Sequence, residues 1–256
     1  NSLGSSVMSA VFKNGKSLSP NTEQALKYVA KVGVMTKAVW LESFCHGKKR
    51  WQNWQLKILI DNDLLKKHNC DLGDYYVLGD QGQRIAKTLN WNLVDPVNPR
   101  QFRHDELVAH SLLKLEQKNI CRNWMIEKEI KKSHKTKFLI QDQGDQTKYP
   151  DAICEAYMGK NYHLVAIEYE RNGKTLPRYR RILWSYNKLN RFSLVLFIVE
   201  NEVLKKRIKS SLKHLGRVAL IEKIGFVDAI EWQKNPQAAS IELATTKTNF
   251  EKLSSI

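Results

Sequence analysis

Strand and helix patterns alternate along the second half of the chain, and this alternation restricts the fold more than any other feature of the sequence. Apolar runs typical of buried strands are separated by segments with the helical spacing of apolar residues. A strand, a helix, a strand, a helix and a strand are predicted in turn at residues 163–170, 176–189, 193–200, 201–215 and 218–224. Strands joined through helices run parallel, with right-handed crossovers. The sequence therefore predicts a sheet with a parallel part and flanking helices.

A helix and three more strands are predicted upstream of this alternation. The helix covers residues 104–119, with a buried side formed by Leu107, Val108, Ser111, Leu112 and Leu115. The strands are predicted at residues 123–130, 137–143 and 151–157, and a polar turn joins the last two. Together these elements predict a mixed sheet. We assign residues 104–232 to one domain and residues 233–256 to a polar, loosely attached C-terminal tail.

The first part of the chain has the pattern of three helices followed by a hairpin. The helices are predicted at residues 22–32, 35–44 and 47–65, and the third carries Leu56 and Leu59 inward. A strand, a turn at Gly73, a second strand and a helix follow. This order is typical of winged helix-turn-helix domains, which place the third helix in the major groove of DNA. The predicted fold class is α+β or α/β, with an N-terminal winged helix-turn-helix followed by a mixed β-sheet flanked by helices.

Three further segments complete the predicted organisation. Residues 1–20 are expected to form a flexible tail, residues 21–95 the winged-helix domain, and residues 96–103 a linker that contains Pro96 and Pro99. No run of about 18 uncharged apolar residues occurs, so no transmembrane helix is expected. The cysteines are widely spaced and form no C-x-x-C pair, which argues against a zinc site and indicates reduced thiols in a cytoplasm.

The start of the third predicted helix is a candidate DNA-binding surface. Its candidate contact residues are Lys48, Lys49, Arg50, Gln52 and Asn53. Lysine and arginine hold phosphates or guanine, and glutamine and asparagine can bond adenine. Trp51 and Trp54 lie three positions apart and therefore share a helix face. Two interpretations of this pair stay open: both rings pack in the core, or one lies at the DNA surface.

The charge of the chain favours a nucleic-acid partner. The formal net charge is +16, and cationic surfaces bind nucleic acids by releasing counterions from phosphates. Residues 171–217 contain 13 Lys and Arg against 2 acids. The basic helix within this range is equally typical of a solvated surface. The partner predicted from composition is DNA.

Three carboxylates are predicted to gather at one edge of the sheet. Asp151 begins one predicted strand, Glu168 lies near the end of the next, and Glu170 shares the face of Glu168 because it is two positions further on. Taken singly, each acid is also typical of a turn or a solvated strand face. Gathered carboxylates repel one another unless a divalent cation lies between them, and Mg²⁺ prefers hard oxygen ligands. The sequence therefore predicts a Mg²⁺ or Mn²⁺ site that could activate a nucleophile against a phosphodiester.

The order of these motifs resembles a known nuclease fold. Pro150-Asp151 followed by Glu168-Tyr169-Glu170 is similar to the PD-(D/E)XK motif, except that Glu170 stands at the usual lysine position. More narrowly, the winged-helix pattern, a helix containing His-Asp, then PDA, AIEYER and R-Y-x₆-Y resemble the replication–relaxation family, which includes MobC-type plasmid relaxases. The resemblance covers about residues 21–225. It implies a restriction-endonuclease-like core of a helix, an antiparallel set of strands, a crossover helix and a further strand.

The resemblance also implies roles for particular residues. Asp151 and Glu168 match the metal-binding acids, and Glu106 matches an acid that the first helix of this fold often supplies. His110 lies one turn after Glu106 on the same face and is a further candidate. The basic residue moves to a helix in some members of this fold, and the candidates here are Arg178, Arg181 and Lys188. A tyrosine nucleophile stays open among Tyr169, Tyr179 and Tyr186, and strand alternation is expected to turn Tyr169 away from Glu168.

The implied activity is metal-dependent nicking of one DNA strand at a plasmid origin of transfer during conjugative mobilisation. The implied setting is a bacterial cytoplasm, with origin DNA, an accessory mobilisation protein or a type IV coupling protein as partners. Two alternatives stay open. One is a restriction-type or repair-type endonuclease that cuts both strands, and the other is a non-catalytic regulator of plasmid replication or transcription that binds DNA.

Overall fold

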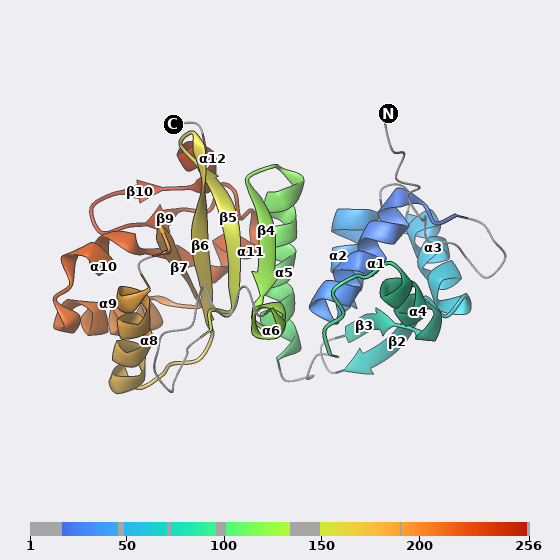
Figure 1. Ribbon diagram of the computed structural model, residues 1–256, viewed down its shortest axis with the longest axis horizontal. Helices are drawn as coiled ribbons and strands as arrows, with labels where there is room; N and C mark the ends of the chain where they lie inside the picture. The colour runs from blue at the N-terminus through green and yellow to red at the C-terminus, as the bar shows by residue number, and fades with distance from the viewer. Residues whose placement is uncertain are drawn as a thin grey trace, which may run out of the picture. The chain divides into compact units, whose positions relative to one another are not determined.

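The chain folds into two compact units, which divide at residue 106. A computed structural model describes residues 17–45, 49–70, 73–95, 101–133, 149–189 and 191–254. The units are Asn1–Glu106 and Leu107–Ile256 (Figure 1). In these described ranges, the first unit has a three-stranded sheet and the second a seven-stranded sheet. The protein is therefore a mixed α+β protein, which agrees with the coarse fold class expected from the sequence.

The first unit consists of short helices packed around a small antiparallel sheet. Its elements are α1 (Pro20–Val32), β1 (Met35–Thr36), α2 (Lys37–Val39), the π-helix η1 (Trp40–Phe44), α3 (Lys49–Asp61), β2 (Leu65–Cys70), β3 (Gly73–Leu78) and α4 (Asp80–Thr88). The sheet has the order β1-β3-β2. Ser19 caps the start of α1 through Thr22, and Gly33 ends it in the left-handed conformation that glycine adopts without strain.

The helices and hairpin predicted for this unit are present, with local differences. Leu56 and Leu59 of α3 are buried as predicted. The helix predicted at residues 35–44 is divided into α2 and η1, and its first two residues form β1, which pairs with β3. Predicted linker residues 96–100 lie outside the described residues, and Phe102 already belongs to a helix and is buried. Residues 1–16 of the predicted tail also lie outside them.

The second unit is built on a mixed sheet with the order β10-β9-β8-β7-β6-β5-β4. Its elements begin with α5 (Phe102–Gln117), which starts in the first unit, and continue with β4 (Cys121–Ile126), α6 (Glu127–Lys132), β5 (Ala152–Met158), β6 (Asn161–Glu170), α8 (Leu176–Lys188), β7 (Leu194–Val199), α9 (Glu202–Leu215), α10 (Val218–Lys223), β8 (Ile224–Asp228), α11 (Ala229–Lys234), β9 (Ile241–Glu242), β10 (Lys247–Thr248) and α12 (Phe250–Ser254). Strands β4, β5 and β6 pair antiparallel, and β6, β7 and β8 pair parallel.

Helices α8 and α9 lie side by side against one face of the parallel part of this sheet (Figure 1). Tyr179 and Leu183 of α8 and Ile208 of α9 pack with Val195 and Phe197 of β7 in one buried cluster. Ala166 of β6 belongs to the same cluster, so this face of β6 also lies against the helices. Polar side chains on that face of β6 must find their partners on α8 or in the loop that leads to it.

The sequence patterns were wrong at two predicted strands. The strand predicted at residues 123–130 ends at Ile126, because the Glu129 carboxylate accepts the Ile126 amide hydrogen and α6 begins there. The strand predicted at residues 218–224 is helix α10 as far as Lys223, with Leu220 buried, and β8 begins at Ile224. The strand predicted at residues 137–143 lies outside the described residues.

The C-terminal segment is packed onto the second unit, contrary to the expectation of a loose tail. Strands β9 and β10 extend the sheet beyond β8. Ile241 and Phe250 are fully buried, and the Phe250 ring lies 5.9 Å from that of Trp232. The polar composition of residues 233–256 concealed these few apolar anchors. Within the described ranges, no helix has the length and apolarity of a membrane-spanning segment.

Glu242 on β9 is held by two lysines of α9, and this contact gives the fold a testable dependence on pH. Hydrogen bonds from Lys209 and Lys205 lower the pKa of Glu242 from 4.5 to about 2. Because the folded-state pKa is depressed, the stabilisation is complete above the unfolded pKa and is lost as the pH falls toward about 2. Glu242→Gln is expected to lower the free energy of unfolding at neutral pH by about 1–2 kcal/mol, since partial exposure screens the pair. Urea unfolding of both proteins between about pH 5 and pH 2 tests this, and an unchanged pH profile in the variant would contradict it.

Candidate carboxylate site

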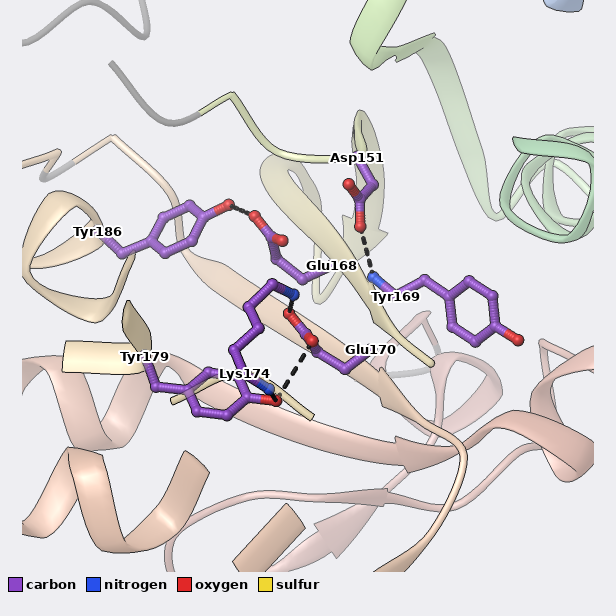
Figure 2. Close-up of polar contacts among 7 residues, drawn as sticks. All are labelled: Asp151, Glu168, Tyr169, Glu170, Lys174, Tyr179 and Tyr186. Carbon is purple, nitrogen blue, oxygen red and sulfur yellow. Dashed lines mark hydrogen bonds and ion pairs between the residues drawn. The ribbon is translucent and has the colours of Figure 1, made fainter. Parts of the chain in front are cut away.

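Asp151 and Glu168 lie together at the end of two neighbouring strands. Ala152 of β5 stands opposite Ile167 of β6, so this register brings Asp151, just before β5, beside Glu168. The Asp151 carboxylate accepts the backbone N–H of Tyr169 through Oδ2 at 2.8 Å (Figure 2). This bond fixes Asp151 against the outgoing end of β6. Asp151 and Glu168 therefore lie opposite each other where β5 begins and β6 ends.

Glu168 is buried and is bound by a tyrosine of α8. Its side chain is 1% exposed, and its Oε1 accepts a hydrogen bond from the Tyr186 hydroxyl (Figure 2). Burial first, and then the charges of Glu168, Asp151 and Glu170, raise the pKa of Tyr186 well above its usual value of 10.0. At neutral pH the phenol is therefore protonated and acts as a donor.

Glu170 is equally buried but has a different set of partners. It is 1% exposed, forms an ion pair with Lys174, and accepts a hydrogen bond from the Tyr179 hydroxyl at 3.3 Å. Lys174 comes from the loop between β6 and α8, and its side chain turns back toward Glu170 (Figure 2). The Tyr179 hydroxyl in turn accepts the backbone N–H of Lys174 at 3.2 Å. Glu170 is thus neutralised by a lysine within the site.

The order of these contacts follows from the path of the chain. Glu168 and Glu170 are two positions apart on β6 and point to the same face. After β6 the chain turns at the Lys174 loop and runs back as α8, so Tyr179 reaches Glu170 and Tyr186 reaches Glu168. The two tyrosines are seven positions apart, which is about two helical turns, and therefore share the inner face of α8. The arrangement places one hydroxyl donor over each buried carboxylate.

Tyr169 lies between the two glutamates in sequence but points away from both side chains (Figure 2). Its hydroxyl donates to the Glu200 carboxylate just after β7. The expectation that strand alternation turns Tyr169 away from Glu168 is confirmed. Tyr179 and Tyr186 are the tyrosines that the structure places at the carboxylates, and burial is the largest cause that raises the pKa of each.

The other acid predicted for this site has a partner in the first unit. Glu106 accepts a hydrogen bond from the Thr36 hydroxyl, and burial raises the pKa of Glu106. His110 is half-buried one turn further along α5. Arg178, Arg181 and Lys188 are exposed on α8, whereas Tyr179 and Tyr186 occupy its buried face. The assignment of these five residues to the carboxylate site therefore stays a prediction.

The paired acids offer a small set of hard oxygen donors. In the part of the chain that the structure describes, no group of three or more His, Cys, Asp and Glu side chains has an arrangement that could hold a metal ion. Glu170 is paired with a cation, Lys174, whereas Asp151 and Glu168 accept hydrogen bonds from the neutral Tyr169 N–H and Tyr186 hydroxyl. Mg²⁺ is often held by only one or two carboxylates, with the remaining positions taken by water and substrate phosphate. Two carboxylates are as many protein ligands as such an ion often has.

Lys174 is the site residue that the sequence patterns missed. The basic residues predicted from the resemblance lie on α8, because the motif position itself holds Glu170. One sequence feature points to Lys174: it lies four residues after Glu170. A loop of that length can fold back so that the lysine reaches the end of β6. Tyr179 and Tyr186 are predicted from the sequence as candidate nucleophiles, whereas the structure shows them as the hydrogen-bond donors that buried carboxylates require.

The predicted DNA-binding helix α3 has an exposed face that differs from the predicted one. Arg50 and Asn53 are exposed, whereas Gln52 donates to the Cys45 carbonyl at 2.7 Å and is half-buried. Lys48 and the side chain of Lys49 lie outside the described residues. Trp51 and Trp54 are both exposed, so the interpretation that both rings pack in the core is wrong.

The fold and the contacts define a mixed α+β protein with two units and a buried carboxylate site on the second. No protein-family model, no curated protein and no solved structure matches the chain.

Proposed function

We propose that the protein is a metal-dependent DNA endonuclease of the PD-(D/E)XK type. The observation that carries the proposal is the position of Asp151 opposite Glu168 at the ends of two neighbouring strands, with the ammonium group of Lys174 paired to Glu170 two positions further along β6. The element order supports it, since α5, antiparallel β4, β5 and β6, crossover helix α8 and parallel β7 follow the core that the motif resemblance implies. The first unit, with three helical segments and a hairpin, supports a winged helix-turn-helix.

Each residue of the site has a distinct role in this proposal. Asp151 and Glu168 hold a Mg²⁺ or Mn²⁺ ion, which would supply an activated nucleophile and stabilise the leaving oxygen of a phosphodiester. Lys174 provides the positive charge that the motif usually takes from the position of Glu170, and Glu170 with Tyr179 holds the Lys174 loop in place. Tyr186 keeps Glu168 oriented through a hydrogen bond. With a raised pKa, the Tyr186 hydroxyl serves as a donor rather than as a nucleophile.

The finer proposal is a relaxase that nicks one strand at a plasmid origin of transfer. It is supported by the order of the sequence motifs, by the net charge of +16 and by the combination of a DNA-binding type of unit with the carboxylate site. The basic surface would hold the phosphates, and the first unit would select the sequence. An accessory mobilisation protein or a type IV coupling protein would then be the protein partner, in a bacterial cytoplasm.

Metal dependence of DNA cleavage is the direct test of this function. Supercoiled plasmid that carries a candidate origin is expected to be converted to the open circle in Mn²⁺ or Mg²⁺ and to stay supercoiled in EDTA. Agarose gels separate the products, and a linear product instead of an open circle would favour the endonuclease that cuts both strands. Cleavage that persists unchanged in EDTA would contradict the proposed mechanism.

A non-catalytic DNA-binding regulator is a second candidate, and the burial of the site favours it. Glu168 is 1% exposed under Tyr186, and Glu170 is already neutralised by Lys174. Such contacts also stabilise a fold that performs no reaction. Titration calorimetry with Mn²⁺ separates the candidates: heat that depends on Asp151 supports the nuclease, whereas no binding together with tight sequence-specific DNA affinity supports the regulator.

A further inference from the structure

Two tryptophans stack on each other on the outer face of α3. Trp51 is 49% exposed and Trp54 is 51% exposed, and their ring centroids lie 4.6 Å apart with 29° between the planes. In the described part of the first unit, these are the large hydrophobic side chains that stay exposed. Tryptophan carries one of the largest apolar surfaces of any side chain, so an exposed pair marks a contact surface.

The inner face of α3 packs against the rest of the first unit without any contribution from Trp51 or Trp54. Leu56 and Leu59 are buried, and the Trp40 indole donates to the Gln52 carbonyl at 3.3 Å. The Gln52 side chain donates to the Cys45 carbonyl at 2.7 Å. Helix α3 therefore presents Trp51 and Trp54 outward from a fixed position, and packing of the unit does not require either ring.

The neighbours of the two rings are polar and basic. Arg50, Asn53 and Lys57 are exposed on α3, at positions that alternate with the tryptophans. Cationic side chains interleaved with aromatic rings are typical of surfaces that bind single-stranded nucleic acid, where cations hold phosphates and the rings stack on bases. A second protein would meet charged groups beside the indoles, whereas a polyanion complements them, as it complements the net charge of +16.

The geometry of duplex DNA indicates whether the tryptophan pair suits a double strand or a single strand. A paired base shows only its edge in the major groove, and an indole has one hydrogen-bond donor with which to read that edge. The flat faces of Trp51 and Trp54 can be used fully only by a base whose own face is exposed. We propose that the surface formed by Arg50, Trp51, Asn53, Trp54 and Lys57 binds an unpaired DNA strand, with at least one base stacked on the tryptophan pair. This proposal rests on the DNA-binding part of the proposed function and is independent of catalysis.

The test measures binding of the full chain in EDTA, so that no cleavage is needed. The probes are a fluorescein-labelled 16-nucleotide oligothymidylate and a duplex of the same length, followed by anisotropy and by quenching of tryptophan fluorescence. Trp54→Ala and Trp51→Ala are each expected to weaken binding of the single strand by roughly 5- to 150-fold, the range found for loss of one stacked base. Binding of the duplex should change less than about threefold, because phosphate contacts dominate it.

Matched variants keep the test decisive. Trp184→Ala removes another exposed tryptophan, from α8, and is expected to leave binding of oligothymidylate unchanged. Trp54→Leu keeps apolar surface but removes the aromatic face, so it should weaken the single-strand complex as Trp54→Ala does. Circular dichroism checks that each variant is folded.

Several outcomes would overturn the proposal. Oligothymidylate binding that is unchanged in both alanine variants would exclude stacking on the pair. If Trp54→Leu binds oligothymidylate as tightly as the parent protein, the surface is an apolar contact for another protein. The same conclusion follows if sedimentation shows that the parent protein is a dimer and that the two alanine variants are monomers. A parent protein that binds no DNA would overturn the proposed function as well. A parent protein that binds the single strand but never nicks would overturn only the nuclease.

Discussion

Replacing Asp151 with asparagine is expected to reduce nicking by about a thousandfold, equivalent to ~4 kcal/mol of transition-state stabilisation. The amide oxygen of asparagine can still accept the Tyr169 N–H that Asp151 accepts at 2.8 Å, so the edge of the sheet keeps its hydrogen bond. What the variant loses is one of the two carboxylate charges of the pair. Affinity for Mn²⁺, measured by calorimetry, should fall with the activity, whereas affinity for duplex DNA should not fall.

The matched control for Asp151→Asn is Glu155→Gln on β5, the strand that Asp151 precedes. Glu155 pairs with exposed Arg122 at 2.8 Å, and this contact lowers the pKa of Glu155. Glu155→Gln removes the same charge from β5 without changing the Asp151–Glu168 pair, so nicking and Mn²⁺ affinity should match those of the parent protein. Full activity in Asp151→Asn, or equal loss in both variants, would refute the assignment of Asp151 to the site.

The sequence was sufficient to predict which backbone segments meet at the site. Apolar runs and helical spacing predicted β5, β6, α8, β7 and α9, and the two-residue period of a strand placed Glu168 and Glu170 on one face. Those are properties of short stretches, and the register of β5 with β6 then brings Asp151 beside Glu168. Where a stretch was apolar but short, as at residues 218–224, the sequence could not separate one helical turn from a strand.

The partners of each carboxylate could not be predicted in the same way. Pairing of Glu170 with Lys174 depends on how the loop after β6 turns back, and loop geometry has no periodic signal. The contacts of Glu168 with Tyr186 and of Glu170 with Tyr179 depend on the rotation of α8 about its axis. For the same reason Gln52 was assigned to the DNA face of α3, although its side chain turns to the Cys45 carbonyl.

Lys174→Met is expected to lower the free energy of unfolding by about 3 kcal/mol, because it leaves the buried Glu170 carboxylate without its cation. Glu170 is 1% exposed and Lys174 is 22% exposed at its side chain, so solvent replaces little of the lost interaction. The Tyr179 hydroxyl still donates to Glu170 at 3.3 Å in the variant. The expected loss of stability is therefore at the lower end of the range found when one partner of a buried ion pair is removed. The midpoint of urea unfolding measures the loss, and Lys160→Met, at the exposed turn between β5 and β6, should leave it unchanged.

The double variant Glu170→Gln with Lys174→Met separates the structural role of Lys174 from its part in the reaction. Both charges are absent, and the glutamine oxygen can still accept from Tyr179, so stability is expected to return to within about 1 kcal/mol of the parent protein. If Lys174 supplies the positive charge of the motif, nicking stays lost in this stable double variant. Recovery of nicking would instead assign Lys174 only to the support of Glu170, and an unchanged midpoint in Lys174→Met would show that the pair does not stabilise the fold. The two measurements are independent because unfolding is followed in the absence of DNA and nicking is followed well below the unfolding midpoint.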